Sequence, residues 1–332
     1  MAYKFKNLVF EGGGVKGIAY GGALEILEER EILDNIKRVA GTSAGAITAG
    51  LLAIGYTHKE VGEILKNTNF RSFMDSTWGF MRDIRRLLRE YGWFKGDAFR
   101  EWFESHLERK TRNKRITFAE LAEEAKANKN YRSLYVVGTN LNRRITEFFD
   151  EERTPKMPIA EAVRMSMSIP LFFRSVKLSN SVYVDGGLYY NYPLHIFDNK
   201  KYVSEENSLP APYDPRDGAV YNKETLGLRV DTKDEINSHL KRIEETPGKI
   251  KNLKDYAMVL VGGLTDNLNK MHLHKNDWHR TIHIDALGVG TTDFDLEDDT
   301  VDALIKSGRD CARIYFRWFD NPAVNEEQPI NK

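Results

Sequence analysis

The sequence lacks the features that mark several common protein classes. Its 332 residues include one cysteine, Cys311, so a fold stapled by disulfides within the chain is excluded. Lys plus Arg number 49 and Asp plus Glu number 49, and this zero net charge argues against a dedicated nucleic-acid binder, which would carry a basic excess. No apolar run has the length of a membrane span, and the N-terminus has no signal-peptide pattern. The sequence therefore predicts a cytoplasmic protein, with export by a route that needs no cleavable signal left open.

The first part of the chain alternates short apolar runs with helical patterns. Residues 6–10 and 36–40 are typical of strands, and residues 17–30 and 46–54 of helices. Such alternation indicates an α/β fold with a mainly parallel sheet covered by helices. Further strands are expected at residues 133–141, 145–149, 181–184, 226–230 and 281–284, and further helices at 97–106, 118–126, 159–167, 255–268 and 298–319.

The chain shows no internal repeat and no clean linker. We expect one domain over residues 1–320, with its core motifs in 7–195 and its C-terminal strands and helix in 225–320. Residues 198–224 contain three prolines and are interpreted as a long surface loop. Residues 321–332 are interpreted as a flexible tail.

Three consecutive glycines follow the first expected strand. Gly12, Gly13 and Gly14 satisfy, together with Lys16 and Gly17, the Gly-x-Gly-x-x-Gly pattern of dinucleotide-binding proteins. That interpretation needs an acidic residue at the end of the second strand, where this sequence has Gly-Thr-Ser. The same glycines let backbone N–H groups converge at the start of a helix, and such donors can form an oxyanion hole for acyl transfer.

A second glycine-flanked motif, Gly41-Thr42-Ser43-Ala44-Gly45, lies between the second expected strand and the next helix. Gly-x-Ser-x-Gly in this position is a nucleophile elbow, a strained turn that projects the serine hydroxyl from the sheet. Gly14 and Ser43 are 43 − 14 = 29 residues apart, which leaves room for one helix and one strand. In α/β-hydrolases the oxyanion glycines lie much farther upstream, so the spacing favours a different fold. Ser43 is the candidate nucleophile of an acyl-ester hydrolase.

A serine hydroxyl needs a base, and Asp185 is the first candidate. It precedes Gly186 and Gly187 and follows an expected strand, which places its carboxylate at a strand end beside a permissive turn. The ordinary pKa of an Asp is about 3.9, so a dry pocket would have to raise it.

Histidine is the rival base, because any histidine could complete a Ser-His-Asp triad. None of the eight lies in a recognisable motif: His58, His106, His195, His239, His272, His274, His279 and His283. The group formed by His272, His274, Asp277 and His279 matches no tight metal-ligand spacing, so no metal site is predicted.

The sequence resembles the patatin-like phospholipases over most of its length. The pattern of that family is a Gly-Gly-Gly-x-Arg/Lys-Gly loop, then Gly-x-Ser-x-Gly, then Asp-Gly-Gly or Asp-Gly-Ala. Residues 12–17, 41–45 and 185–187 match these three motifs in order. The segment 162–173 and the tripeptide at 191–193 are also similar to blocks of the family.

The resemblance implies a three-layer α/β/α fold and a Ser-Asp dyad without histidine. By position, Ser43 would be the nucleophile and Asp185 the proton acceptor, with N–H groups around Gly13 and Gly14 stabilising the oxyanion. Members of the family cleave acyl chains from phospholipids or other lipids without calcium. The resemblance therefore implies a lipid acyl hydrolase of the phospholipase A or lysophospholipase type that needs no cofactor.

A basic segment in the first half of the chain suggests how such an enzyme could reach lipid. Apolar residues fall on one helical face of residues 81–91, while Arg82, Arg85, Arg86 and Arg89 lie off it, and Trp78 and Trp93 flank the segment. A basic amphipathic helix with aromatic neighbours can lie on an anionic membrane. The alternative is a helix packed on the core with its arginines in solvent. Our hypothesis is that residues 70–95 form a lid or membrane-docking element.

The expected partners are a phospholipid or another acyl lipid and, transiently, a membrane surface, without nucleic acid. An activating partner or ligand that the sequence does not identify stays open. Two other interpretations remain: an α/β-hydrolase-like esterase with a Ser-His-Asp triad, and a non-hydrolytic dinucleotide-binding module.

Overall fold

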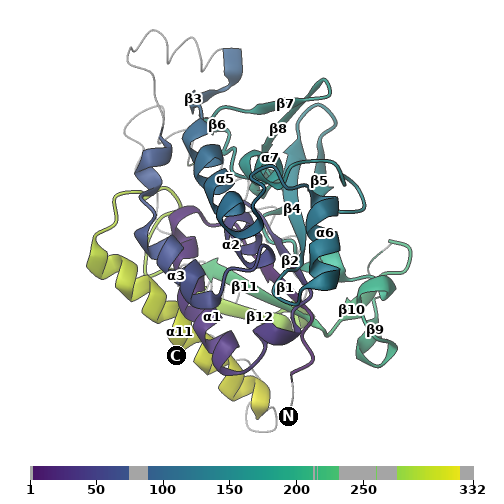
Figure 1. Ribbon diagram of the computed structural model, residues 1–332. Coiled ribbons are helices and arrows are strands. Elements are labelled where there is room, and N and C mark those ends of the chain that lie inside the picture. Colours follow the sequence, from purple (N-terminus) through teal and green to yellow (C-terminus); the bar gives the residue numbers. More distant parts are fainter. Residues whose placement is uncertain are drawn as a thin grey trace.

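The computed structural model describes residues 3–74, 89–211, 214, 216–231, 259 and 275–321. Within them, the central element is an eight-stranded sheet with the strand order β12-β11-β1-β2-β4-β8-β7, in which β5 also pairs with β4 (Figure 1). The strands are β1 Asn7–Phe10, β2 Arg38–Gly41, β4 Ser133–Asn140, β5 Ile145–Phe149, β7 Val176–Leu178, β8 Ser181–Asp185, β11 Thr225–Asp231 and β12 Thr281–Asp285. Strands β12, β11, β1, β2 and β4 are parallel, and β5, β7 and β8 are antiparallel to their neighbours. The predicted mainly parallel sheet is confirmed.

Helices cover one face of this sheet and carry most of the core. They are α1 Tyr20–Glu29, α2 Ala44–Ala53, α3 His58–Asn67, α5 Asp97–Thr111, α6 Phe118–Ala127, α7 Ile159–Ser166 and α11 Asp298–Asp320. Strand residues alternate between the two faces, so Leu8 and Phe10 of β1 belong to the large cluster with these helices, while Val9 belongs to a smaller cluster on the opposite face. The chain after the short helix α8, Gly187–Tyr190, covers part of that opposite face. Its 3-10 turns Leu194–Phe197 and Lys200–Tyr202 supply buried residues to the smaller cluster.

Two predicted elements differ from the structure. The helix expected from residue 17 begins as a 3-10 helix, Gly14–Ala19, and becomes α-helical only at Tyr20. Residues 198–224 were expected as a surface loop, and this prediction is wrong in part: they contain the hairpin of β9 Ser208–Pro210 and β10 Val220–Asn222, and several of their polar side chains are buried. The predicted helix at 255–268 lies outside the described residues, apart from residue 259, and so does the tail beyond residue 321.

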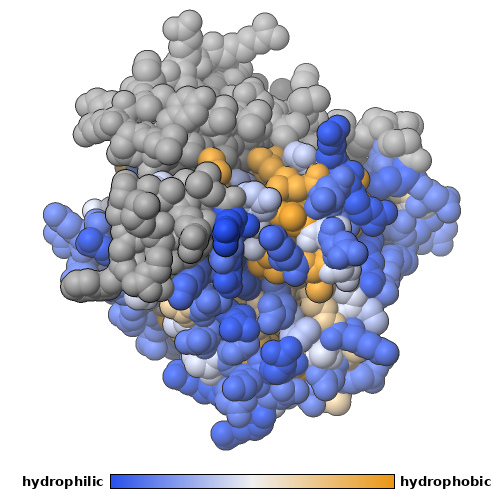
Figure 2. All heavy atoms as spheres, turned by 90° about the horizontal axis from the view of Figure 1, so that it is seen from above, coloured by the Kyte–Doolittle hydropathy of each residue, from blue (hydrophilic) through white to orange (hydrophobic). Residues whose placement is uncertain are grey.

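A second small sheet lies at one end of the molecule. Strand β3, Gly92–Phe94, pairs in parallel with β6, Leu171–Phe173. Seen from above this end, Figure 2 shows an apolar area bordered by polar surface. Exposed apolar side chains here include Tyr91, which is 50% exposed, and Leu171, which is 39% exposed. No helix in the described part of the chain is both long and apolar enough to cross a bilayer.

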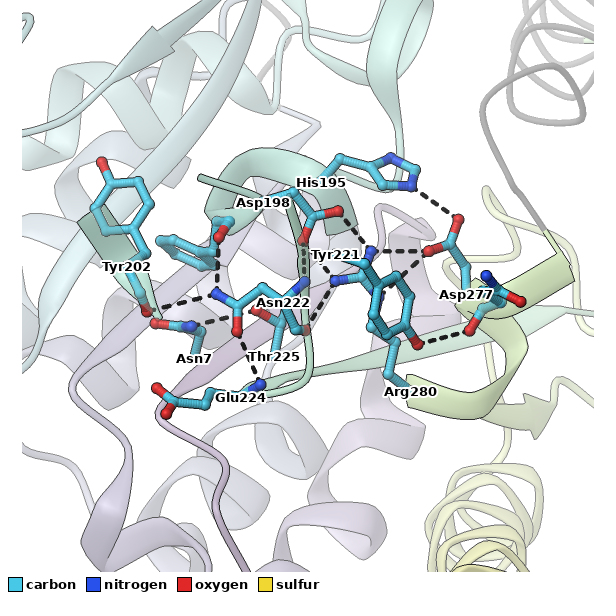
Figure 3. A network of polar contacts seen from close by, with 12 residues as sticks. Asn7, His195, Asp198, Tyr202, Tyr221, Asn222, Glu224, Thr225, Asp277 and Arg280 are labelled. Atoms are coloured by element: carbon cyan, nitrogen blue, oxygen red, sulfur yellow. Dashed lines mark hydrogen bonds and ion pairs between the residues drawn. The ribbon is translucent and has the colours of Figure 1, made fainter. Parts of the chain in front are cut away.

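A buried ionic network occupies the sheet face opposite the main helices (Figure 3). The Arg280 guanidinium donates to both carboxylate oxygens of Asp198 at 2.6 Å and to Asp277 Oδ1 at 2.8 Å. Asp277 Oδ2 lies 2.8 Å from His195 Nε2, and the Arg280 side chain is only 3% exposed. Burial disfavours the charged guanidinium, but Asp198 and Asp277 outweigh it and hold the pKa of Arg280 above its usual range. The network joins the turn after α8 to the segment that leads into β12.

The register of β4 brings two distant strand ends together. Strand β2 runs parallel to β4 and ends with Gly41 opposite Val136. Strand β8 runs antiparallel to β4 and ends with Asp185 opposite Gly138. Because β5 pairs with β4 over 136–140, β2 and β8 must share the other edge of β4, where they run toward each other. Their C-terminal ends therefore meet about two residues, or roughly 7 Å, apart along β4.

Candidate active site

Ser43 occupies a strained turn between β2 and α2. Its backbone has φ 52° and ψ −126°, in the region that side chains other than glycine rarely adopt. The flanking glycines are required by close approach, because a Cβ at Gly41 would lie 2.2 Å from the carbonyl oxygen of Gly45, and one at Gly45 would lie 2.5 Å from that of Glu11. The Ser43 N–H donates to Ser166 Oγ at 2.9 Å, which fixes the turn to the end of α7.

Asp185 is brought to Ser43 by the meeting of β8 and β2. Both side chains are 5% exposed. The Gly187 N–H donates to Asp185 Oδ1 at 2.7 Å, whereas the buried Oδ2 has no hydrogen-bond partner among the described residues. The Ser43 hydroxyl points to Met167 Sδ at 3.7 Å, yet it is near enough to the carboxyl group to lower its pKa. The Ser43 hydroxyl and the Asp185 carboxyl group are therefore close neighbours.

Burial raises the pKa of the Asp185 carboxyl group. Removal of the carboxylate from water raises its pKa from 3.8 to about 7, and the hydrogen bond from Gly187 and the nearby Ser43 hydroxyl only partly oppose this effect. A carboxyl group with a pKa near 7 can both accept and return a proton at neutral pH. The site therefore holds a serine hydroxyl and a carboxyl group of raised pKa close together in a buried position.

Residues 12–17, which we call the glycine loop, lie beside Ser43 and Asp185. The N–H of Gly12 donates to the Asn191 carbonyl oxygen at 3.1 Å, and the N–H of Lys16 donates to the Gly13 carbonyl oxygen at 3.2 Å. In the described part of the chain, no hydrogen bond of the Gly13 or Gly14 N–H to a protein acceptor is found. Gly17 lies inside the 3-10 helix. A Cβ built on Gly17 would lie 3.3 Å from the Cβ of Ala44. Two neighbouring amides, those of Gly13 and Gly14, thus remain as donors for a ligand.

Asn191 connects the glycine loop to the Asp185 turn. Its Nδ2 donates to the Gly12 carbonyl oxygen at 2.8 Å. A Cβ at Gly12 would lie 2.2 Å from Asn191 Oδ1, and one at Gly187 would lie 2.7 Å from the same atom, so a side chain at either position would displace the Asn191 amide. A Cβ at Gly186 would lie 2.5 Å from the Val137 carbonyl oxygen, so this position is also restricted to glycine. The sequence placed Asn191 in a family block but gave no sign of this contact.

Charged groups support the base of the glycine loop. Glu11, directly before the loop, accepts from the Val230 N–H at 3.1 Å and lies 3.4 Å from Arg229 Nε. Arg229 also pairs with Asp231 at 2.6 Å. Burial raises the pKa of Asp231, but the neighbouring Arg229 charge prevails and holds it well below its usual range. Lys16 is buried at this position and adds a further positive charge near Asp231. The sequence did not predict these contacts, because Glu11 and Lys16 lie more than 200 residues before Arg229 and Asp231 of β11.

No described histidine hydrogen-bonds to Ser43 or Asp185. His195 bridges Tyr190 and Asp277, and His106 bonds to the Tyr56 hydroxyl. His283 lies 3.5 Å from Asp231, while His58 and His279 lie near Glu28 and Trp318. His239, His272 and His274 fall outside the described residues. The described part of the chain also contains no cluster of His, Cys, Asp and Glu that could hold a metal ion.

Most of the hypothetical lid lies outside the described residues, including Trp78, Arg82, Arg85 and Arg86. Its end is described: Arg89 is exposed, and Trp93 is half-buried in β3. Because β3 pairs with β6, Trp93 belongs to the end of the molecule that carries Leu171. Leu171 itself has φ 66° and follows the segment that contacts both Ser43 and Asp185.

The sequence is similar to a known family model and to several other proteins. A sequence model described as patatin-like phospholipase matches residues 8–198. The uncharacterised protein YqhO of Bacillus subtilis is 35% identical over 324 residues, covering 93% of this chain and 97% of YqhO. The probable lipid hydrolase 463L of invertebrate iridescent virus 6 is 32% identical over 202 residues, covering 59% of this chain and 66% of the viral protein.

Among solved structures, VipD from Legionella pneumophila has a TM-score of 0.57 at 19% identity, covering 95% of this chain and 67% of VipD, and this likeness concerns the fold alone. The family match is continuous over more than half of the chain and includes the glycine loop, Ser43 and Asp185. Together with the nearly full-length similarity to YqhO, it establishes that this chain belongs to the patatin-like phospholipase family.

Proposed function

We propose that the protein is a lipid acyl hydrolase that cleaves acyl esters with a Ser43–Asp185 dyad. The observation that carries this proposal is the buried Asp185 carboxyl group, which has a pKa of about 7 and an open Oδ2 beside the Ser43 turn. A carboxylate that served only to hold the turn would be expected to have both oxygens hydrogen-bonded. Membership of the patatin-like phospholipase family and the similarity to a viral protein named as a probable lipid hydrolase support a lipid substrate.

The proposed reaction proceeds through an acyl-enzyme. Ser43 Oγ attacks the ester carbonyl carbon while Asp185 accepts the hydroxyl proton, and the carbonyl oxygen becomes an oxyanion. The tetrahedral intermediate collapses, Asp185 returns the proton to the leaving alcohol, and the acyl chain stays on Ser43. Water then attacks the acyl-enzyme with Asp185 again as base, which releases the free fatty acid and restores the serine.

Among the N–H groups of the glycine loop, we propose those of Gly13 and Gly14 as the donors to the oxyanion. Gly12 and Lys16 use their N–H groups within the protein, so Gly12 would act by shaping the loop and Lys16 also by its charge. The partial positive charge at the start of a helix adds to the stabilisation of a negative oxygen here. Removal of one such donor typically costs about 10²–10³ in kcat. The reaction as proposed needs no metal ion or other cofactor.

The function is tested by labelling and by product analysis. The wild-type protein is treated with a fluorophosphonate probe, and the modified peptide is identified by mass spectrometry. It is also incubated with phosphatidylglycerol vesicles, with and without EDTA, and released fatty acid is measured. Labelling of Ser43 and EDTA-insensitive release of fatty acid support the proposal. Labelling elsewhere, or no reaction with the probe and no fatty acid, would overturn it.

The rate should depend on pH through Asp185. This carboxyl group must be ionised to accept the serine proton, and its pKa is about 7. We therefore expect kcat/KM on a soluble ester to be low at pH 5, half-maximal near pH 7 and level above pH 8. A profile that is already level from pH 5 upward would show that no group with this pKa controls the reaction.

We further propose that the end of the molecule formed by β3 and β6 contacts the membrane transiently. Tyr91 and Leu171 are exposed there, and Trp93 directly follows Gly92, the residue of β3 that pairs with Leu171. Trp and Tyr are favoured at the boundary between hydrocarbon and water, and Arg89 supplies a nearby positive charge for anionic headgroups. This surface would bring the Ser43 turn close to the lipid.

Replacement of Trp93 by Ala should weaken binding to phosphatidylglycerol vesicles by roughly tenfold, because an indole that inserts into the interface loses its apolar burial. Replacement of Arg82, Arg85, Arg86 and Arg89 together by Gln should weaken it further and make the remaining binding insensitive to salt. Sedimentation with vesicles measures both. The control is Phe319→Ala, which removes an exposed ring from α11. Unchanged vesicle binding by both test variants would contradict the proposal.

A further inference from the structure

The loop between β12 and α11, residues 286–297, contacts the glycine loop although it lies far outside the segment 8–198 that the family model matches. We call it the β12–α11 loop. Its Thr291 carbonyl oxygen accepts the Val15 N–H at 3.2 Å. The N–H of Val15 is thereby removed as a donor to any ligand, which is one reason why only the two preceding amides remain.

The same carbonyl group determines the conformation of Gly14. This residue has φ 56°, and a Cβ built on it would lie 1.9 Å from the Thr291 oxygen and 2.8 Å from Thr291 Cγ2. Thr291 therefore occupies the place that a side chain would take, and it limits how the peptide of Gly14 can rotate. On the other side of the loop, Asn191 holds both the N–H and the carbonyl oxygen of Gly12. The amides of Gly13 and Gly14 lie between these two points of attachment.

The β12–α11 loop is itself held in shape by local contacts. Asp293 Oδ2 accepts the Gly290 N–H at 2.7 Å, and the Asp293 N–H donates to the Gly290 carbonyl oxygen at 3.2 Å, which closes a tight turn around Thr291. Val289 is buried in the main core. The Phe294 ring packs on Phe172, with centroids 5.4 Å apart, and Phe172 belongs to the segment that also contains Met167 beside Ser43.

We propose that the β12–α11 loop is a positioning element of the active site, which sets the direction of the Gly13 and Gly14 donors relative to Ser43. The proposal rests on the hydrolytic function proposed above. Asp293 and Phe294 act through Thr291 and the glycine loop, so they are positioning residues and do not themselves touch the reacting atoms. Since an oxyanion hole works only if its donors are aligned before the reaction, a loosened loop should lower the rate more than substrate binding.

The test uses one matched pair of variants at an exposed position. Asp293→Ala removes the acceptor that closes the turn, whereas Asp293→Asn keeps an acceptor oxygen at the same place. Phe294→Ala removes the contact with Phe172, and Phe319→Ala is its control elsewhere. For each variant, kcat and KM are measured on a soluble ester, together with the affinity for an alkylboronic acid, which forms a tetrahedral anionic adduct with an active serine. Fluorophosphonate labelling of wild-type Ser43 is checked in parallel.

We expect kcat to fall by roughly tenfold in Asp293→Ala and Phe294→Ala, with KM within about twofold of wild type. Boronate affinity should fall in the same proportion, and Asp293→Asn should recover most of both. If the two variants keep the kcat of Phe319→Ala, if the loss appears in KM alone, or if boronate affinity is unchanged, the positioning role is wrong. Failure of Phe294→Ala to fold leaves the Asp293 pair decisive. Absence of labelling in the wild type would instead refute the proposed function.

Discussion

Asp185→Asn should lower kcat/KM by about 10⁴-fold while the protein stays folded, a loss of the size seen when the acidic member of a serine triad is made neutral. An amide in place of the carboxylate fits the same space and accepts from Gly187, but it cannot take the proton of Ser43. Ser43→Ala should cause a loss at least as large, because no acyl-enzyme can form. The measurement is turnover of a fluorogenic acyl ester by each variant.

Single His→Ala variants are the control for this prediction. If Asp185 is the base, each histidine variant that folds should keep most of the wild-type activity, including those at 239, 272 and 274, which the structure does not describe. A folded histidine variant without activity would favour a Ser-His-Asp triad instead. Full activity in Asp185→Asn would exclude the dyad.

Asp185→Asn should increase the stability of the folded protein, although it lowers the activity. The pKa of Asp185 is higher in the folded protein, about 7, than its ordinary value of 3.8, so between these values the folded state binds more protons than the unfolded state. Stability contributed by this group therefore falls as pH rises from about 4 to 7. The difference of about 3 units corresponds to about 4 kcal/mol at most. Asp185→Asn should accordingly be more stable than wild type in urea at pH 8, and the gain should disappear near pH 4.

Arg280→Met should lower the free energy of unfolding by about 3–5 kcal/mol at pH 7, because it leaves Asp198 and Asp277 buried without their shared cation. Asp198 receives two of the guanidinium hydrogen bonds, and Asp277 would be left with His195. Urea unfolding at constant pH measures the loss. The deficit should shrink in acid, since protonation of the two carboxyl groups removes the uncompensated charges.

Arg309→Met is the matched control for this second prediction. Arg309 donates two hydrogen bonds to Glu25, but this pair is partly exposed, with side chains that are 29% and 38% exposed. Such pairs contribute about 0–1 kcal/mol. If Arg280→Met costs no more than Arg309→Met, the buried network does not contribute to stability in the way proposed.

The sequence predicted the strands that form the parallel part of the sheet, since each is an apolar run bounded by turn residues. It did not predict β3, β6 or β7, which are three residues long and too short to show a period. The segment 198–224 was misassigned because its prolines and charges resemble a solvated loop. In the structure Asp198 and Glu224 are buried, and their charges are compensated by Arg280 and Lys6 from other parts of the chain. Such compensation leaves no local pattern.

In the candidate site, too, local features could be predicted from the sequence, whereas contacts between distant segments could not. The turn at Ser43 and the glycine loop could be predicted because their local backbone geometry requires specific residue types. The contact between Ser43 and Asp185 depends on the register of β2 and β8 along β4, and no single segment encodes it. Thr291 acts through its carbonyl oxygen, which every residue type possesses. A backbone group of this kind leaves no signal in one sequence.

The meeting of β2 and β8 on one edge of β4 also has a consequence for biosynthesis. Ser43 and Asp185 are 185 − 43 = 142 residues apart in the chain, and Gly14 and Thr291 are 291 − 14 = 277 residues apart. A nascent chain emerges from its N-terminus, so the serine leaves the ribosome long before its base and later still receives the contact from Thr291. On the proposed mechanism, a partly synthesised chain would contain Ser43 without the carboxylate that activates it. The order of translation would then delay hydrolytic activity until the chain is nearly complete.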